Sequence, residues 1–184
     1  MELKIIEQTD NKIKFNIKGI NTQLANAFRR TIISGIPVLA IEKVKFYENS
    51  SVIDDEILAH RMGLIPLKTD LASPETISMS LEAKGPKTMY SGELKPNIAV
   101  YETIPIIKLA ENQEVKLEAE AVLGTARDHI KWQAGLASYS KNDDGSYDFF
   151  VESYGQMSPR DLIFTAIKIL NSHLDEFKSK LQEK

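Results

Sequence analysis

The sequence predicts a mixed α+β protein, and three patterns in it indicate that class. Near the N-terminus, apolar and polar residues alternate, as they do in strands that bury one face. From Thr22 onward, and again after Ser158, apolar residues recur every three or four positions, which is typical of amphipathic helices. Between these helical segments the chain returns to strand-like alternation punctuated by turn residues. We therefore expect helices near both ends and strands through most of the middle.

The composition is that of a folded protein. Of the 184 residues, 42% are hydrophobic and 27% are charged, and this length allows one domain or two small ones. The net charge is -3, from 23 basic and 26 acidic residues, so the molecule as a whole has no cationic field for a phosphate backbone. A freestanding nucleic-acid-binding protein is therefore disfavoured.

Cysteine is absent, which excludes disulfides, thiol nucleophiles and iron–sulfur ligation by cysteine. The three histidines, His60, His129 and His173, do not have metal-ligand spacing. No apolar run approaches the roughly 20 residues that a membrane-spanning helix needs. We expect a cytoplasmic protein without a metal, a cofactor or a membrane contact.

The N-terminal segment is expected to form a hairpin and a helix. Apolar residues of one parity lie on either side of Asp10-Asn11 and should share one buried face; they are Leu3, Ile5, Ile13, Phe15 and Ile17. The helix from Thr22 is expected to end at Gly35 and Pro37. Its apolar stripe comprises Leu24, Ala27, Phe28, Thr31 and Ile32, while Ala25 and Ile33 leave apolar surface elsewhere on it.

The middle of the chain is predicted to be mostly β. Residues 38–47 alternate as a strand, and Asp54 can cap a short helix over residues 55–62 that ends at Gly63. Strand-like segments follow, Asp144-Gly145 is a strong hairpin signal, and a further strand is expected around residues 147–151.

The C-terminal segment is predicted to be a long helix, because Ser158 can cap it and Pro159 suits its first turn. Its apolar residues follow a spacing of four, three, four, three and four; they are Ile163, Ile167, Leu170, Leu174, Phe177 and Leu181. This heptad seam indicates a partner helix. The alternative is that the seam is the helix's own core face. Leu162, Phe164 and Ile169 widen the apolar surface, so the helix could serve both purposes.

Asp128 and His129 are the only tempting catalytic pair, because a carboxylate can orient an imidazole. Adjacent residues of a strand point to opposite faces, and no nucleophile motif accompanies them. The segment from Gly124 to Trp132 is better interpreted as an exposed basic and aromatic loop that contacts another protein, or as a solvated loop with a packed Trp132.

Three motifs resemble the RNA polymerase alpha family. Residues 26–37 resemble its N-A-L/F-R-R-x-x-x-S-x-I-P helix and stop. Residues 55–67 are similar to the D-E-x-x-A-H-R-L-G-L-I-P-L element of archaeal D-type subunits and the eukaryotic third-largest subunit. Residues 124–132 are similar to the G-x-x-[KR]-[DE]-H-x-K-W segment of D-type subunits. Together with the C-terminal helix, the resemblance covers essentially the whole chain.

The resemblance implies a discontinuous dimerisation domain, an antiparallel sheet with two helices, assigned here to residues 1–38 and 147–184. A β-rich domain over residues 39–146 would be inserted into it. The implied function is that of a non-catalytic assembly subunit of DNA-directed RNA polymerase, whose catalytic residues lie in other subunits. Many D-type subunits also carry a cysteine-rich iron–sulfur domain, but only residues 141–146 bridge the hairpin here, so no cluster is expected.

The resemblance also implies partners for particular residues. The surface for the small L subunit would comprise Leu24, Phe28, Ile32, Ile163, Ile167, Leu170, Leu174 and Phe177. Docking to the large subunits would use Asn26, Arg29, Arg30, His60, Arg61, Arg127, His129, Lys131 and Trp132, the last four from the inserted domain.

Two rival functions make different structural demands. A small hydrolase would need a pocket that converges on Asp128 and His129. A freestanding nucleic-acid-binding module would need one continuous cationic strip made by Arg29, Arg30, Arg61 and Lys131.

Overall fold

The computed structural model describes residues 1–70 and 74–182, and it divides the chain into two compact units. Unit 1 consists of Met1–Pro37 and Thr125–Lys184, and unit 2 consists of Val38–Gly124. Helices and strands occur in both units, so the α+β class predicted from the sequence is confirmed. Unit 1 is discontinuous in sequence because the chain leaves it after the first helix and returns after the last strand of unit 2.

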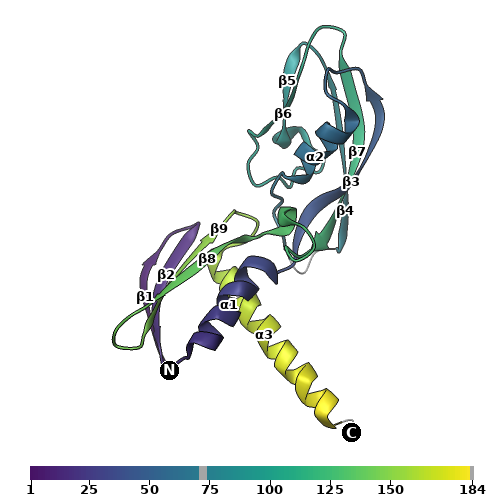
Figure 1. Cartoon of the computed structure of the whole chain (residues 1–184). Coiled ribbons are helices and arrows are strands. Elements are labelled where there is room, and N and C mark those ends of the chain that lie inside the picture. Colours follow the sequence, from purple (N-terminus) through teal and green to yellow (C-terminus); the bar gives the residue numbers. More distant parts are fainter. Residues whose placement is uncertain (71–73, 183–184) are drawn as a thin grey trace. The chain divides into compact units, whose positions relative to one another are not determined.

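The sheet of unit 1 joins the two ends of the chain (Figure 1). Its antiparallel strands lie in the order β1 (Glu2–Gln8), β2 (Lys12–Lys18), β9 (Tyr147–Ser153) and β8 (Gly135–Lys141). Hairpins connect β1 to β2 and β8 to β9, whereas the central β2–β9 pair joins strands that are distant in sequence. This central pairing gives unit 1 its discontinuity.

The second domain boundary differs from the one assigned from the sequence. We placed it after residue 146, but the structure places it after residue 124. The reason is that β8 pairs with β9 along its whole length, from Gly135 opposite Ser153 to Lys141 opposite Tyr147. The preceding loop and the short 3-10 helix η2 (Ile130–Trp132) therefore belong to unit 1 rather than to the inserted unit.

Two helices pack on the sheet of unit 1. Helix α1 (Thr22–Ser34) begins at Asn21, whose side-chain oxygen accepts a hydrogen bond of 2.8 Å from the Leu24 N–H, and it contacts β8. Helix α3 (Pro159–Gln182) contacts β9, β2 and α1. The predicted cap at Ser158 is present, since its hydroxyl oxygen accepts a hydrogen bond of 3.1 Å from the Asp161 N–H.

An aromatic cluster forms the centre of the unit 1 core. The Phe15 ring stacks on the Phe149 ring at a centroid distance of 5.2 Å, and Phe28 of α1 meets Phe149 edge-on at 5.6 Å. The helices add side chains that are almost completely inaccessible, namely Ala25, Ile32, Leu162 and Ala166. Each large apolar side chain buried in this way stabilises the fold by about 1.5–3 kcal/mol relative to exposure.

Unit 2 is built on a three-stranded antiparallel sheet in the order β3-β7-β4, with a separate two-stranded sheet formed by β5 and β6. Its elements are β3 (Val38–Asn49), α2 (Asp55–Gly63), β4 (Thr76–Lys84), β5 (Lys87–Tyr90), η1 (Ser91–Glu93), β6 (Pro105–Leu109) and β7 (Glu114–Gly124). Strand β7 buries every second residue, including Val115 and Leu117, against a core that also contains Leu58 and Met62 of α2. The prediction that the middle of the chain is mostly β is confirmed, and alternation marks β4 and β7 most clearly.

Gly135 at the start of β8 is expected to be essential for packing in unit 1. A Cβ atom at this position would lie 2.3 Å from the carbonyl oxygen of Glu152 and 3.1 Å from Cδ1 of Leu162. Because the closer atom belongs to the backbone of the paired strand, Gly135→Ala should destabilise the protein by about 1–3 kcal/mol. Thermal denaturation would measure this loss, with Ser138→Ala at an exposed position of β8 as the control. Equal melting temperatures for Gly135→Ala and the parent would contradict the prediction.

Candidate protein–protein interface

The two helices of unit 1 leave a large apolar surface uncovered. Several of their apolar side chains remain between two fifths and two thirds exposed; they are Leu24 (48%), Phe164 (52%), Ile167 (43%), Leu174 (59%), Phe177 (63%) and Leu181 (64%). Scattered exposed leucines are ordinary, but these residues occur on two helices that contact each other. A concentration of this kind indicates a surface that another protein covers.

Helix α3 carries two adjacent apolar stripes with different environments. Leu162 and Ala166 are completely buried in unit 1. The heptad seam lies beside them: Ile163 and Leu170 are half-buried, and Ile167 is exposed. The helix therefore uses Leu162 and Ala166 for its own core, with Ile163 and Leu170 partly buried beside them, while the remainder of the seam stays exposed. From Asn171 to Gln182 every residue is exposed, as this half of α3 extends past the sheet (Figure 1).

Ile32 was predicted to face the partner, but its side chain is buried. Ile32 has no exposed surface within its own chain, so it cannot lie on an interface with another subunit. Ala25, expected to leave apolar surface free, is buried as well. These two residues lie seven positions apart on the side of α1 that packs into unit 1, while Leu24 is exposed and Phe28 is half-buried against Phe149.

Strand β1 adds apolar surface that the sequence analysis assigned to the core. Leu3 is 59% exposed and Ile5 is 48% exposed. The register places Leu3 opposite Ile17 and Ile5 opposite Phe15, so both side chains lie on the helix-covered face of the sheet. Alternation correctly assigned their face, but it could not reveal that β1 is an edge strand and that its apolar side chains stay exposed.

The loop before β8 combines exposed basic residues with a buried aromatic ring. Arg127 and His129 are exposed, and the Lys131 ammonium lies 4.3 Å from the centroid of the Trp132 ring. Trp132 itself is only 7% exposed, so it packs inside unit 1 and could take part in docking only by supporting its neighbours. The alternative of a loop with a packed Trp132 describes this residue correctly.

Asp128 and His129 do not form the dyad that a hydrolase would need. The Asp128 carboxylate accepts a hydrogen bond of 3.0 Å from the Thr125 hydroxyl. His129 Nδ1 accepts a hydrogen bond of 3.2 Å from the Lys131 N–H. Each side chain is exposed and stabilises the local turn, so neither orients the other for proton transfer.

The other residues that were predicted to dock a large partner lie partly in unit 1 and partly in unit 2. In α1, the Arg29 guanidinium donates a hydrogen bond of 3.1 Å to the Asn26 side-chain oxygen, and Arg30 is exposed. In α2, His60 is exposed and the Arg61 guanidinium donates a hydrogen bond of 2.9 Å to the Pro105 carbonyl. Two exposed apolar residues lie three positions before His60 and three after Arg61, namely Ile57 (54%) and Leu64 (50%). Each unit therefore presents its own mixed basic and apolar surface.

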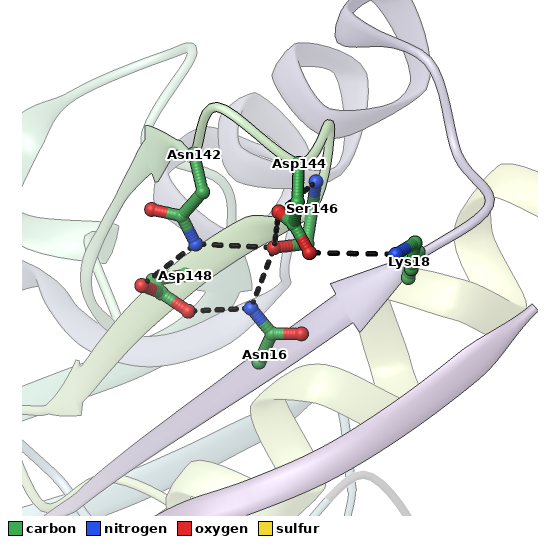
Figure 2. A network of polar contacts seen from close by, with 6 residues as sticks. All are labelled: Asn16, Lys18, Asn142, Asp144, Ser146 and Asp148. Atoms are coloured by element: carbon green, nitrogen blue, oxygen red, sulfur yellow. Dashed lines mark hydrogen bonds and ion pairs between the residues drawn. The ribbon is translucent and has the colours of Figure 1, made fainter.

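A polar network fastens the β8–β9 hairpin to β2 (Figure 2). The Asp148 carboxylate accepts hydrogen bonds from the side-chain amides of Asn16 (2.7 Å) and Asn142 (3.0 Å), which lower its pKa below the ordinary aspartate value. Hydrogen bonds from the Ser146 hydroxyl and N–H lower the pKa of Asp144 in the same way. Across residues 1–70 and 74–182, no group of three or more His, Asp or Glu side chains could hold a metal ion. Nor does any helix in these residues combine the length and apolar character needed to cross a membrane.

The stability of the chain is expected to depend on the ionised Asp148. Because the folded-state pKa lies below the ordinary value of 3.8, the stabilising contribution is fully present above that value and is lost as pH falls through the folded pKa. Asp148→Asn should therefore lower the free energy of unfolding at about pH 6, and its difference from the parent should shrink by about pH 3. Urea denaturation across this range measures the difference. Asp143→Asn, an exposed residue of the same hairpin, is the control, and a pH-independent difference would contradict the assignment.

The sequence of this chain is similar to a known family model and to several known proteins. Residues 14–174 match the family model described as the RNA polymerase Rpb3/Rpb11 dimerisation domain. A DNA-directed RNA polymerase subunit Rpo3 from Methanocaldococcus jannaschii is 44% identical over 86% of this chain and 84% of that relative. The Rpo3 subunit from Pyrococcus furiosus is also 44% identical, over 76% of this chain but only 58% of its own length. The Rpo3 subunit from Halobacterium salinarum is 32% identical over 98% of this chain and 97% of that relative.

Proposed function

This chain belongs to the RNA polymerase Rpb3/Rpb11 dimerisation-domain family, and we propose that it is a non-catalytic assembly subunit of DNA-directed RNA polymerase. It would act in transcription as the D-type, alpha-like component of a nucleotidyltransferase complex whose catalytic residues lie in other subunits. The observation that carries this proposal is the exposed apolar surface on α1 and α3 of unit 1. Such a surface is costly in water and suits permanent association.

The partner proposed for this surface is the small L subunit. Leu24 and Phe28 of α1 would contact it together with the seam of α3, which comprises Ile163, Ile167, Leu170, Leu174, Phe177 and Leu181. Leu3 and Ile5 extend the apolar area on the same face of the sheet. Obligate interfaces commonly bury more than about 2,000 Å², and each Å² of apolar surface removed from water contributes about 25 cal/mol before the costs of association.

Docking to the large subunits is proposed for the exposed basic residues. In unit 1 these are Arg30, Arg127 and His129, together with the half-buried Arg29 and Lys131 and the Arg29 partner Asn26; in unit 2 they are His60 and Arg61. Trp132 would act indirectly, because its buried ring supports the Lys131 ammonium. Charged residues at the rim of an interface chiefly govern the association rate and the orientation of the partners.

The subunit is proposed to work without a cofactor. The chain has no cysteine, so it cannot provide the thiolates that hold an iron–sulfur cluster. The β8–β9 hairpin, where the family resemblance leads one to look for a cysteine-rich insertion, is instead closed by the short network of Asn142, Asp144 and Ser146. Its contribution to transcription would be recognition of other subunits.

A carboxylate introduced into the seam should abolish the heterodimer. Ile167→Asp or Leu174→Asp would bury an unpaired charge at the interface and should weaken association by at least roughly 30-fold, or about 2 kcal/mol. Co-expression with the L subunit of the same organism, followed by size-exclusion chromatography with light scattering, measures the outcome. Ser172→Asp is the matched control, because it adds the same charge at an exposed position of α3 outside the seam. A 1:1 complex that survives Ile167→Asp and Leu174→Asp would refute the proposed interface.

Without its partner the purified chain is expected to self-associate. The exposed apolar side chains of α1 and α3 would then contact the same side chains of neighbouring molecules. Light scattering over a range of protein concentrations should show a rising average mass for the lone chain and a constant mass for the complex. A lone chain that stays monomeric at every concentration and ignores the L subunit would argue against an assembly role.

A further inference from the structure

The distal half of α3 makes a distinct recognition element. Residues Asn171–Gln182 are all exposed, and this segment spans roughly 18 Å at 1.5 Å per residue. Its apolar side chains Leu174, Phe177 and Leu181 are 59%, 63% and 64% exposed and continue the seam of the proximal half. A spacing of three and four residues matches another helix, whereas a strand would present apolar residues at a spacing of two. The occupant of this segment is therefore a helix.

The charges beside this distal seam are of one sign. With 3.6 residues per turn, Lys178 lies roughly 70° to one side of the seam's centre and Lys180 roughly 90° to the other. The two carboxylates of the segment, Asp175 and Glu176, lie farther round, at roughly 130° on either side. Within residues 171–182, the charged side chains nearest the partner are thus both lysines.

The lysines already have partners on their own helix, but these pairs leave them accessible. The Lys178 ammonium lies 3.7 Å from the Asp175 carboxylate, and the two side chains are 74% and 76% exposed. Lys180 pairs with Glu176, with side chains that are 68% and 59% exposed. Solvent-exposed pairs of this kind contribute little to the stability of a helix, so a carboxylate on a bound helix can compete for the same ammonium groups.

We propose that the distal half of α3 packs against a helix of the small partner subunit whose apolar seam is flanked by Asp or Glu residues. The inference rests on the proposed function and specifies the chemistry of the partner surface. Two lysines facing a basic or neutral flank would gain nothing, whereas carboxylates at the facing positions would pair with Lys178 and Lys180. These peripheral ion pairs would steer association and fix the register of the two helices.

A charge exchange within the helix tests this proposal. The double variant Asp175→Lys/Lys178→Glu keeps the net charge and an ion pair three residues apart, but it places a carboxylate beside the seam. Its dissociation constant for the L subunit should rise roughly three- to tenfold at low salt. The parent complex should also lose affinity as salt increases, and the exchanged variant should lose less.

Lys168→Glu is the matched control for the single variant Lys178→Glu, because both reverse one exposed lysine of α3 but Lys168 lies away from the seam. Only Lys178→Glu should weaken the complex. Equal affinity and equal salt dependence for the exchanged variant and the parent would overturn this inference while the assembly function stands. A parent chain that forms no complex with the L subunit would overturn both.

Discussion

The pairing of β2 with β9 is the contact on which the rest of unit 1 depends. It brings Lys12–Ile17 and Tyr147–Glu152 together from opposite ends of the chain. Phe15 can stack on Phe149, and Asn16 can donate to Asp148, only because this register is formed. Helix α1 follows β2 and helix α3 follows β9, so the same pairing brings the two helices together. A contact between such distant segments closes a long loop, whose entropy cost rises only slowly with its length.

Helix α3 has two functions: it packs on the sheet of unit 1, and it presents an apolar surface to a partner. Its surface at Leu162 and Ala166 is completely buried and attaches the helix to the sheet. In the neighbouring stripe, Ile167, Leu174, Phe177 and Leu181 remain exposed. Each of these two surfaces occupies only part of the circumference of the helix, because successive residues are about 100° apart around its axis. Attachment of the proximal half holds the distal half in a fixed direction from the sheet. A partner then meets a preformed seam, which lowers the conformational entropy that association must overcome.

Local signals in the sequence identified local structure well. Ser158 stands at the start of α3, Gly35 ends α1, and the Asp144-Gly145 turn joins β8 to β9. These features depend on hydrogen bonds and backbone conformations within a few residues, so a short stretch of sequence is enough to specify them. The heptad spacing of α3 likewise indicated a surface beyond the helix's own core. The domain boundary after residue 146 was wrong because strand β8 joins the sheet of unit 1 through its pairing with β9, which lies later in the chain.

The sequence by itself determined the α+β class, the helices and most strands, because side-chain periodicity follows directly from backbone geometry. It also determined the absence of cysteine chemistry and the seam of α3. Only the tertiary structure decided that Ile32 and Trp132 are buried, and that Leu3 and Ile5 lie exposed on an edge strand. Periodicity tells which residues share a face, but whether another element covers that face depends on contacts between segments far apart in the chain. Burial is therefore a property of the assembled fold, and it separates the residues available to a partner from those that hold the subunit together.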